Sequence, residues 1–231
     1  MSENNKIYLF VRDYSKAMND KYLPVIEEVE SKIRAFDSQS KKDGNPIISR
    51  YCHRIKDVYE VIKKAEEKGI DLTLDEAEER IHDIIGFRIV TTFLYEIYDF
   101  AKILSEFDGF KVIDVKDYIM KPKDSGYRSL HLIIEVDVKE LPQPVTVEFQ
   151  IRDVLMDGWC EIEHKMKYKG GGLSESLDSL FVEKAEKLNS FDEEISKYKF
   201  IERQKASQNH TTSNLAKVVA AESIIEQKPE S

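Results

Sequence analysis

Four short segments rich in β-branched and aromatic residues follow one another between residues 86 and 152, and this succession constrains the fold more than any other feature. We predict strands at residues 86–93, 110–118, 128–138 and 144–152. A single helical pattern, at residues 95–107, interrupts them. Because strands and helices do not alternate regularly, we predict an α+β fold with a mixed β-sheet of about five strands flanked by helices.

Helical patterns lie on both sides of this region. We predict helices at residues 13–38, 47–68, 154–168 and 174–200, the second of which carries HRIK and ends at Gly69. We therefore expect a helical N-terminal extension (1–46), a core (47–172), a C-terminal helical segment (173–200) and a polar, mobile tail (201–231).

Composition argues against several classes of protein. The chain is 41% hydrophobic and 34% charged, as in a globular protein, and its net charge of −9 argues against a general nucleic-acid coat. Cys52 and Cys160 have no paired spacing, so they predict neither a disulfide framework nor a zinc site. We find no signal-peptide pattern and no apolar run of membrane-spanning length, and we expect a cytoplasmic protein.

The strand VTVEFQIR places polar side chains on one face. Its period of two puts Glu148, Gln150 and Arg152 on one side and apolar residues on the other. Such a row suits either the solvated face of an edge strand or one wall of a binding site.

The helix predicted after this strand has an apolar and a polar face. The apolar stripe consists of Leu155, Trp159, Ile162 and Met166, and the polar face consists of Asp157, Glu161, His164 and Tyr168. Polar faces on two consecutive elements indicate a cleft between them, which favours the binding-site interpretation of the strand.

The segment KPKDSGYRSLH is a candidate third wall. Lys121 and Lys123 suit phosphates, Gly126 lets the backbone turn close to a ligand, and Tyr127 offers a ring for a base to stack on. The alternative is a hairpin with solubilising lysines and a tyrosine packed on the core. That alternative explains each residue separately better than it explains the whole set.

Two carboxylates are candidate metal ligands. Asp83 lies just before the strand at 86–93, which contains Arg88, and Asp83 with Glu148 would offer magnesium two hard oxygen ligands. His82 and Asp83 also form an HD dipeptide, which we interpret as coincidental because no further well-placed ligands accompany it.

Five motifs occur in the order found in one enzyme family. They are RIK, DIIGFRI, KDYIMKPKDSGYRSLH, VEFQIR and MDGWCEIEHKMKYK, and over about residues 47–170 they resemble the synthetase domain of the RelA/SpoT family, most of all its small single-domain members. The resemblance implies a nucleotidyltransferase-like synthetase fold and a GTP diphosphokinase of the stringent response. Such an enzyme transfers the β,γ-pyrophosphate of ATP to the ribose 3′-OH of GDP or GTP, giving AMP and ppGpp or pppGpp.

The resemblance also implies roles for the residues on the ATP side. Arg54 and Arg88 would stack on the adenine, as planar guanidinium groups can. The residues implied for the ATP phosphates are Lys56, Lys64, Lys121 and Arg152. Asp83 and Glu148 would hold Mg²⁺, and Glu148 or Gln150 would orient or deprotonate the attacking hydroxyl.

For the acceptor nucleotide, the resemblance implies that Tyr127 stacks on guanine. Asp157 would bind the guanine edge, since a carboxylate can accept from N1–H and N2–H together. The residues implied for the acceptor's phosphates or ribose are Lys116, Lys123 and His131.

The chain departs from the usual family motifs at several positions. RIKDVYE replaces a motif close to RIKSPES, which places Asp57 and Glu60 near the expected ATP phosphates and predicts weaker ATP binding. Ser125, Asp153 and Gly158 also stand where other residues are usual, and Gly158 puts the nucleotide preference in question.

Two other functions are alternatives. Relatives that pyrophosphorylate the 3′ end of tRNA need a basic surface, for which Lys165, Lys167 and Lys169 are candidates, although the net acidity and Asp157 argue against it. A non-catalytic regulator that binds nucleotide or RNA has the altered RIKDVYE motif as its only support. By analogy with small synthetases we expect a homo-oligomer, a tetramer, with the segment at 174–200 as a candidate interface and RNA as a candidate regulator.

Overall fold

The computed structural model describes residues 3–168 and 174–225, with the side chains of residues 3–167, 174–199, 201 and 202. The chain divides into two units, residues 1–189 and 190–231. The candidate site residues all belong to the first unit. Among the described residues, no helix combines the length and the apolar composition needed to cross a membrane.

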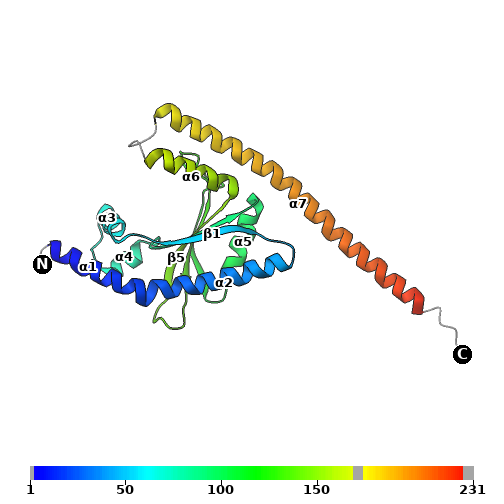
Figure 1. Cartoon of the computed structure of the whole chain (residues 1–231), viewed down its shortest axis with the longest axis horizontal. Helices are drawn as coiled ribbons and strands as arrows, with labels where there is room; N and C mark the ends of the chain where they lie inside the picture. The colour runs from blue at the N-terminus through cyan, green and yellow to red at the C-terminus, as the bar shows by residue number, and fades with distance from the viewer. Residues whose placement is uncertain (1–2, 169–173, 226–231) are drawn as a thin grey trace. The chain divides into compact units, whose positions relative to one another are not determined.

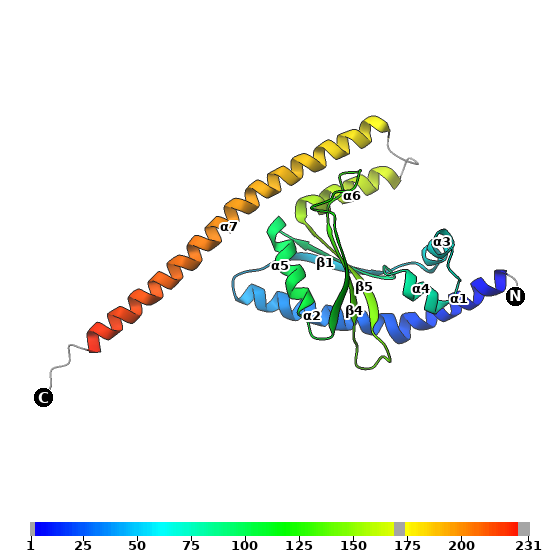
Figure 2. The same ribbon diagram turned by 180° about the vertical axis from the view of Figure 1, so that it is seen from behind.

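The first unit is built on a mixed β-sheet (Figures 1 and 2). Its described strands are β1 (Ile48–Ile55), β2 (Ile85–Thr91), β3 (Phe110–Asp117), β4 (Leu130–Val136) and β5 (Val145–Asp153). They pair in the order β1-β2-β5-β4-β3, with β2 and β5 parallel and every other neighbouring pair antiparallel. The predicted α+β class and mixed sheet of about five strands are confirmed.

Helices precede, separate and follow these strands along the chain. They are α1 (Glu3–Ala17), a π-helical turn (Met18–Tyr22), α2 (Leu23–Lys42), α3 (Val58–Lys68), α4 (Leu74–Arg80), α5 (Leu94–Ser105), α6 (Val154–Tyr168) and α7 (Glu175–Ile225), which continues into the second unit. The N-terminal helical region therefore starts earlier than the predicted residue 13, and the sequence analysis missed the short helix α4.

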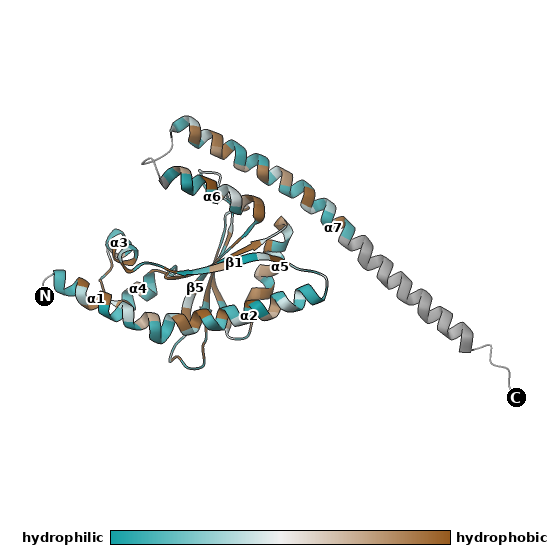
Figure 3. Cartoon of the chain, in the orientation of Figure 1, coloured by the Kyte–Doolittle hydropathy of each residue, from teal (hydrophilic) through white to brown (hydrophobic). Residues whose placement is uncertain are grey.

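The main core lies on one face of the sheet, where α2 and α5 pack. Val29 and Ile33 of α2 and Phe100 of α5 are fully buried, as are Phe87 and Phe149, whose stacked rings lie 5.5 Å apart on β2 and β5. Figure 3 shows the apolar side of α2 turned toward the sheet. Burying each such side chain contributes about 1.5–3 kcal/mol, so this face holds the sheet together and leaves the opposite face for polar residues.

The predicted helix at residues 47–68 is wrong over its first half, because Ile48–Ile55 form the edge strand β1. Helical periodicity is real only from Val58 onward, where Val61, Ile62 and Ala65 are buried. Asp57 ends the extended segment and caps α3, its carboxylate accepting from the backbone N–H of Tyr59 at 2.9 Å. Pairing with β2 along the length of β1 outweighs any local helical preference.

The predicted faces of α6 are also partly wrong. Met156 and Trp159 are buried, but Ile162 and Met166 of the predicted apolar stripe are 59% and 47% exposed, and Asp157 of the predicted polar face is only 1% exposed. The buried face is short because α6 contacts the sheet near its own N-terminus, beside β2 and β5.

Candidate active site

Two neighbouring rows of side chains cross the polar face of the sheet. From β1 to β3, the first row is Cys52, Arg88, Gln150, His131 and Lys116. In the same direction, the second row is Arg54, Gly86, Glu148, Ile133 and Asp114. Both rows lie on one face because directly paired residues, and residues two apart along a strand, point to the same side. The sheet thus gathers residues from five separate segments of the sequence.

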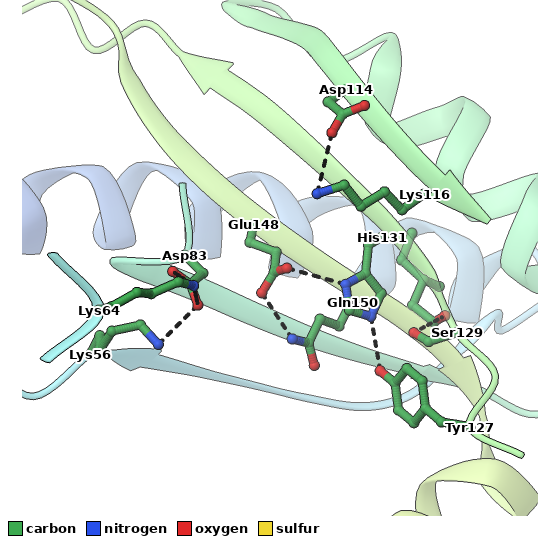
Figure 4. Close-up of polar contacts among 11 residues, drawn as sticks. Lys56, Lys64, Asp83, Asp114, Lys116, Tyr127, Ser129, His131, Glu148 and Gln150 are labelled. Atoms are coloured by element: carbon green, nitrogen blue, oxygen red, sulfur yellow. Dashed lines mark hydrogen bonds and ion pairs between the residues drawn. The ribbon is translucent and has the colours of Figure 1, made fainter. Parts of the chain in front are cut away.

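Glu148 lies at the centre of this face and is held by two neighbours (Figure 4). Gln150 Nε2 donates to Glu148 Oε2 at 2.9 Å, and His131 Nδ1 lies 3.1 Å from Oε1. Burial alone would raise the pKa of this carboxyl, but the hydrogen bonds from His131 and Gln150 outweigh it and leave the pKa below its ordinary value. Glu148 is therefore ionised at neutral pH.

Asp83, just before β2, is the second carboxylate of the site. Lys64 of α3 donates to both of its oxygens at 2.8 Å, and Lys56 lies 2.9 Å from Oδ2 (Figure 4). Burial opposes the ionised form, but the two lysines more than compensate and lower the pKa of Asp83. The Tyr14 hydroxyl donates to the Lys56 carbonyl oxygen at 2.6 Å, so α1 helps to hold this lysine in place.

The two carboxylates could hold a divalent cation together. They are close enough for the charge of Asp83 to oppose ionisation of Glu148. No group of three His, Cys, Asp or Glu side chains suited to a metal occurs in the part of the chain that the structure describes. A pair of carboxylates that leaves the other positions open fits magnesium, which usually takes one or two protein carboxylates and completes its shell with water and substrate phosphates.

Arg54 and Arg88 lie on adjacent strands and in adjacent rows. Between Arg54 and Glu148 the second row contains only Gly86, where an added Cβ would lie 3.8 Å from Arg54 Cγ. The absence of a side chain there leaves space beside the two guanidinium groups. Such a gap suits a flat, ring-shaped ligand.

Asp157 is buried among arginines. Its carboxylate forms ion pairs with Arg152 at 2.8 Å, with Arg88 at 3.9 Å and with Arg50. Arg152 is itself almost fully buried, with only 3% of its side chain exposed. The structure thus brings two predicted nucleotide ligands, Asp157 and Arg152, into contact with each other, and it adds Arg50, which lies before the RIK motif and was not predicted.

The third predicted wall contains a cluster of rings. The Tyr127 hydroxyl lies 2.9 Å from His131 Nε2, and the Lys123 ammonium lies 4.7 Å from the Tyr118 ring centre and 5.0 Å from that of Tyr127. Tyr118 was not predicted, although it stands only three residues before Lys121. Lys123 occupies a ring face on which a base could stack.

The remaining predicted residues lie at the rim of this face. Lys116 is 3.6 Å from Asp114, one strand away from His131. Lys121 is exposed, and its backbone N–H donates to the Asp117 carbonyl oxygen at 3.1 Å. Both lysines are free to reorient, since neither side chain is buried.

Residues 53–172 match a family model described as a region found in RelA/SpoT proteins. Over 155 residues the chain is 39% identical to GTP pyrophosphokinase YwaC of Bacillus subtilis, covering 66% of this chain and 74% of that protein. It is 32% identical to GTP pyrophosphokinase YjbM of the same organism, covering 76% and 83%. Among solved structures it resembles small alarmone synthetase 1 from Bacillus subtilis bound to its product pppGpp, with a TM-score of 0.70, 30% identity and coverage of 80% and 97%.

Proposed function

The chain belongs to the RelA/SpoT family, and on that premise we propose that it is a (p)ppGpp synthetase, which transfers the β,γ-pyrophosphate of ATP to the 3′-hydroxyl of GDP or GTP. The observation that carries this proposal is the position of Glu148 at the centre of one sheet face. Lysines and arginines lie on one side of it, and the Tyr118–Tyr127 ring cluster lies on the other. Two nucleotides approaching from opposite sides would meet at this carboxylate.

Glu148 acts in this proposal mainly by orientation. Its low pKa makes it a weak base but keeps it available as an ionised acceptor for the 3′-OH proton. Transfer of a phosphoryl-type group depends chiefly on positioning and electrostatic stabilisation, so a weak base is adequate. Gln150 and His131 hold the carboxylate in place from either side.

On the donor side, Arg54 and Arg88 receive the adenine and the lysines receive the phosphates. Lys56 and Lys64 are paired with Asp83 in the structure, and phosphate oxygens offer them alternative anionic partners. Asp83 and Glu148 would then hold Mg²⁺, which supplies charge neutralisation for the transferred group when bound.

On the acceptor side, Tyr127 stacks on guanine, and Lys116, Lys123 and His131 serve its phosphates and ribose. Lys123 would leave the Tyr127 ring face that it covers when the base arrives. Asp157 would contact the guanine edge only by giving up one of its arginine partners, of which Arg50 is the most exposed.

The test is product identification by mass spectrometry after incubation of the chain with Mg²⁺, ATP and either GDP or GTP. We expect AMP and guanosine carrying a 3′-pyrophosphate. Glu148→Gln should lower kcat by about 10²–10⁴-fold, the range typical of a lost acid–base group, without loss of fold by circular dichroism. Glu135→Gln, on β4 in an exposed pair with Lys111, is the matched control and should keep wild-type turnover. If Glu148→Gln turns over normally, the assignment of the central carboxylate is wrong.

We also propose that the chain works in the cytoplasm as a homotetramer, with RNA as a candidate regulator. Light scattering coupled to size exclusion, with and without RNA, tests the assembly and its response. The tRNA alternative gains no support from Lys167, which is paired with Glu163, and Lys169 lies outside the described residues.

A further inference from the structure

The start of α7 packs against the segment that carries Tyr127. A second, smaller core lies here, and its members are Met156, Trp159 and Ala185, with Tyr127, Cys160, Phe181 and Leu188 packed against them. Tyr127 therefore belongs both to the site, through its hydroxyl, and to a core completed by residues of α7.

Gly126, immediately before Tyr127, allows the closest of these contacts. Its φ of +85° lies in the left-handed region, and an added Cβ would stand 2.8 Å from Ala185 Cβ and 3.3 Å from Val182 Cα. A Cβ at this position would therefore push α7 away or displace Tyr127. The backbone at Gly126 therefore packs directly against α7, with no room for a side chain between them.

Arg128, immediately after Tyr127, ties the same segment to α7 by charge. Its side chain is buried, and it donates to the Gly126 carbonyl oxygen at 3.2 Å and to Glu186 Oε1 at 2.9 Å. One guanidinium thus links the turn before Tyr127 to a residue one position along α7 from Ala185. Charge-assisted hydrogen bonds of this kind are the stronger ones in proteins.

Trp159 of α6 forms the third connection. Its indole N–H donates to the Phe181 carbonyl oxygen at 3.1 Å, and the two rings meet edge to face with centres 5.8 Å apart. Trp159 is the only tryptophan in the chain, so its fluorescence reports on this junction alone.

We propose that residues 175–189 of α7 act as a clamp that positions Tyr127 for the acceptor nucleotide. Arg128, Glu186 and the Gly126–Ala185 contact are its positioning residues. The proposal rests on the function proposed above, in which Tyr127 serves the acceptor. The donor-side lysines Lys56 and Lys64 are held instead by Asp83, so loosening the clamp should weaken use of GDP or GTP and spare ATP.

The first experiment replaces Glu186 and compares KM for GDP with KM for ATP. Glu186→Ala should raise KM for GDP about tenfold, the effect of losing roughly one charge-assisted hydrogen bond, while KM for ATP stays unchanged. Glu183→Ala is the matched control, because Glu183 lies in the same helix but pairs with Lys184 and Lys187 at the surface. Equal increases in both constants would overturn the proposal, since they would indicate general loosening.

The second experiment tests the contact itself with a double-mutant cycle. Gly126→Ala should raise KM for GDP more than Glu186→Ala does. Adding Ala185→Gly removes the atom with which the new Cβ collides and should recover part of the loss, while the strain of a positive φ remains. If Ala185→Gly gives no recovery, the clamp does not act through this contact.

The third experiment uses Trp159 emission. Glu186→Ala should shift the emission to longer wavelength. GDP should reverse the shift, while the ATP analogue AMPCPP, which binds on the donor side, should not. An emission spectrum identical to that of the wild type would contradict the clamp. Because GDP binding and emission need no turnover, they test the clamp even if the wild-type chain makes no 3′-pyrophosphorylated product, a result that would defeat only the proposed function.

Discussion

At the scale of single residues, Asp157 faces more positive charge than it can neutralise. Three guanidinium groups, from Arg50, Arg88 and Arg152, surround one carboxylate. Arg152 is buried, whereas Arg50 and Arg88 are 54% and 40% exposed and keep donors free for a ligand. Asp157 thus holds two exposed arginines in place beside the site, and their surplus charge remains available to an anionic substrate.

Replacing Asp157 should therefore destabilise the fold. Asp157→Ala leaves the Arg152 charge buried and unpaired, and loss of one partner from such a pair costs about 3–5 kcal/mol. Urea unfolding followed by circular dichroism measures the change in stability. Adding Arg152→Met to Asp157→Ala should recover most of the lost stability. An unfolding midpoint equal to that of the wild type would show that the buried pair contributes little.

A thiol in the first row offers a test of the adenine position. Cys52 is exposed and pairs directly with Arg88 across β1 and β2, whereas burial raises the pKa of the Cys160 thiol to about 11. Iodoacetamide should therefore modify Cys52 much faster than Cys160. AMPCPP should slow the modification of Cys52, as followed by mass spectrometry, with Cys160 as the internal reference. Undiminished alkylation of Cys52 at saturating AMPCPP would place the adenine elsewhere.

Single residues could be predicted where strand periodicity decides their direction. The face shared by Glu148, Gln150 and Arg152 follows from a period of two, and the structure has these residues on the polar face. Their partners could not be predicted in the same way. The pairing of Arg152 with Asp157, and of Asp83 with Lys56 and Lys64, depends on how separate elements pack, which no local pattern contains.

At the scale of elements, the largest error concerns β1. Ile48–Ile55 carries mostly polar, exposed residues, so it lacks the alternation that marks a half-buried strand, and its two neighbours in sequence are a turn and a true helix. β1 is a strand because β2 offers it a full ladder of partners. An edge strand that pairs with one neighbour and has no hydrophobic alternation can be recognised only once the whole sheet is known.

Because Ile48–Ile55 form a strand and α3 begins only at Val58, the RIKDVYE sequence has a different structural role. Asp57 caps α3, so its carboxylate is engaged with the helix backbone. Asp57→Ala should lower the free energy of unfolding by about 1 kcal/mol, the usual effect of losing such a cap, and leave KM for ATP unchanged. Chemical denaturation and steady-state kinetics on the same variant measure both quantities. A lower KM for ATP in the variant would instead support repulsion of the phosphates by Asp57.

At the scale of the whole molecule, the cations of the site contrast with the chain's net charge of −9. Positive residues gather on one polar face of the sheet, while the chain as a whole is acidic. A small nucleotide meets mainly the local cations, but a long polyanion also meets the acidic remainder, and the molecule therefore favours mononucleotides.

Deacylated tRNA should consequently be a poor acceptor. With γ-³²P-labelled ATP, we expect label in guanosine nucleotide and none in tRNA, and an excess of tRNA should not slow the reaction with GDP. The assay is best run at low ionic strength, which strengthens binding to phosphate backbones and gives the tRNA hypothesis its most favourable conditions. Labelled tRNA under those conditions would contradict the argument from charge.

The strand order also affects how the chain folds as it is synthesised. The last strand to be synthesised, β5, occupies the middle of the sheet, between β2 and β4. Until the ribosome has released it, the chain can form only the separate pairs β1–β2 and β3–β4. Pairings between distant segments form slowly, so insertion of β5 is expected to be a late step in folding. Because the same strand carries Glu148, the carboxylate proposed to orient the acceptor hydroxyl, we expect an unfinished chain to consume no ATP and activity to begin only when the sheet is complete.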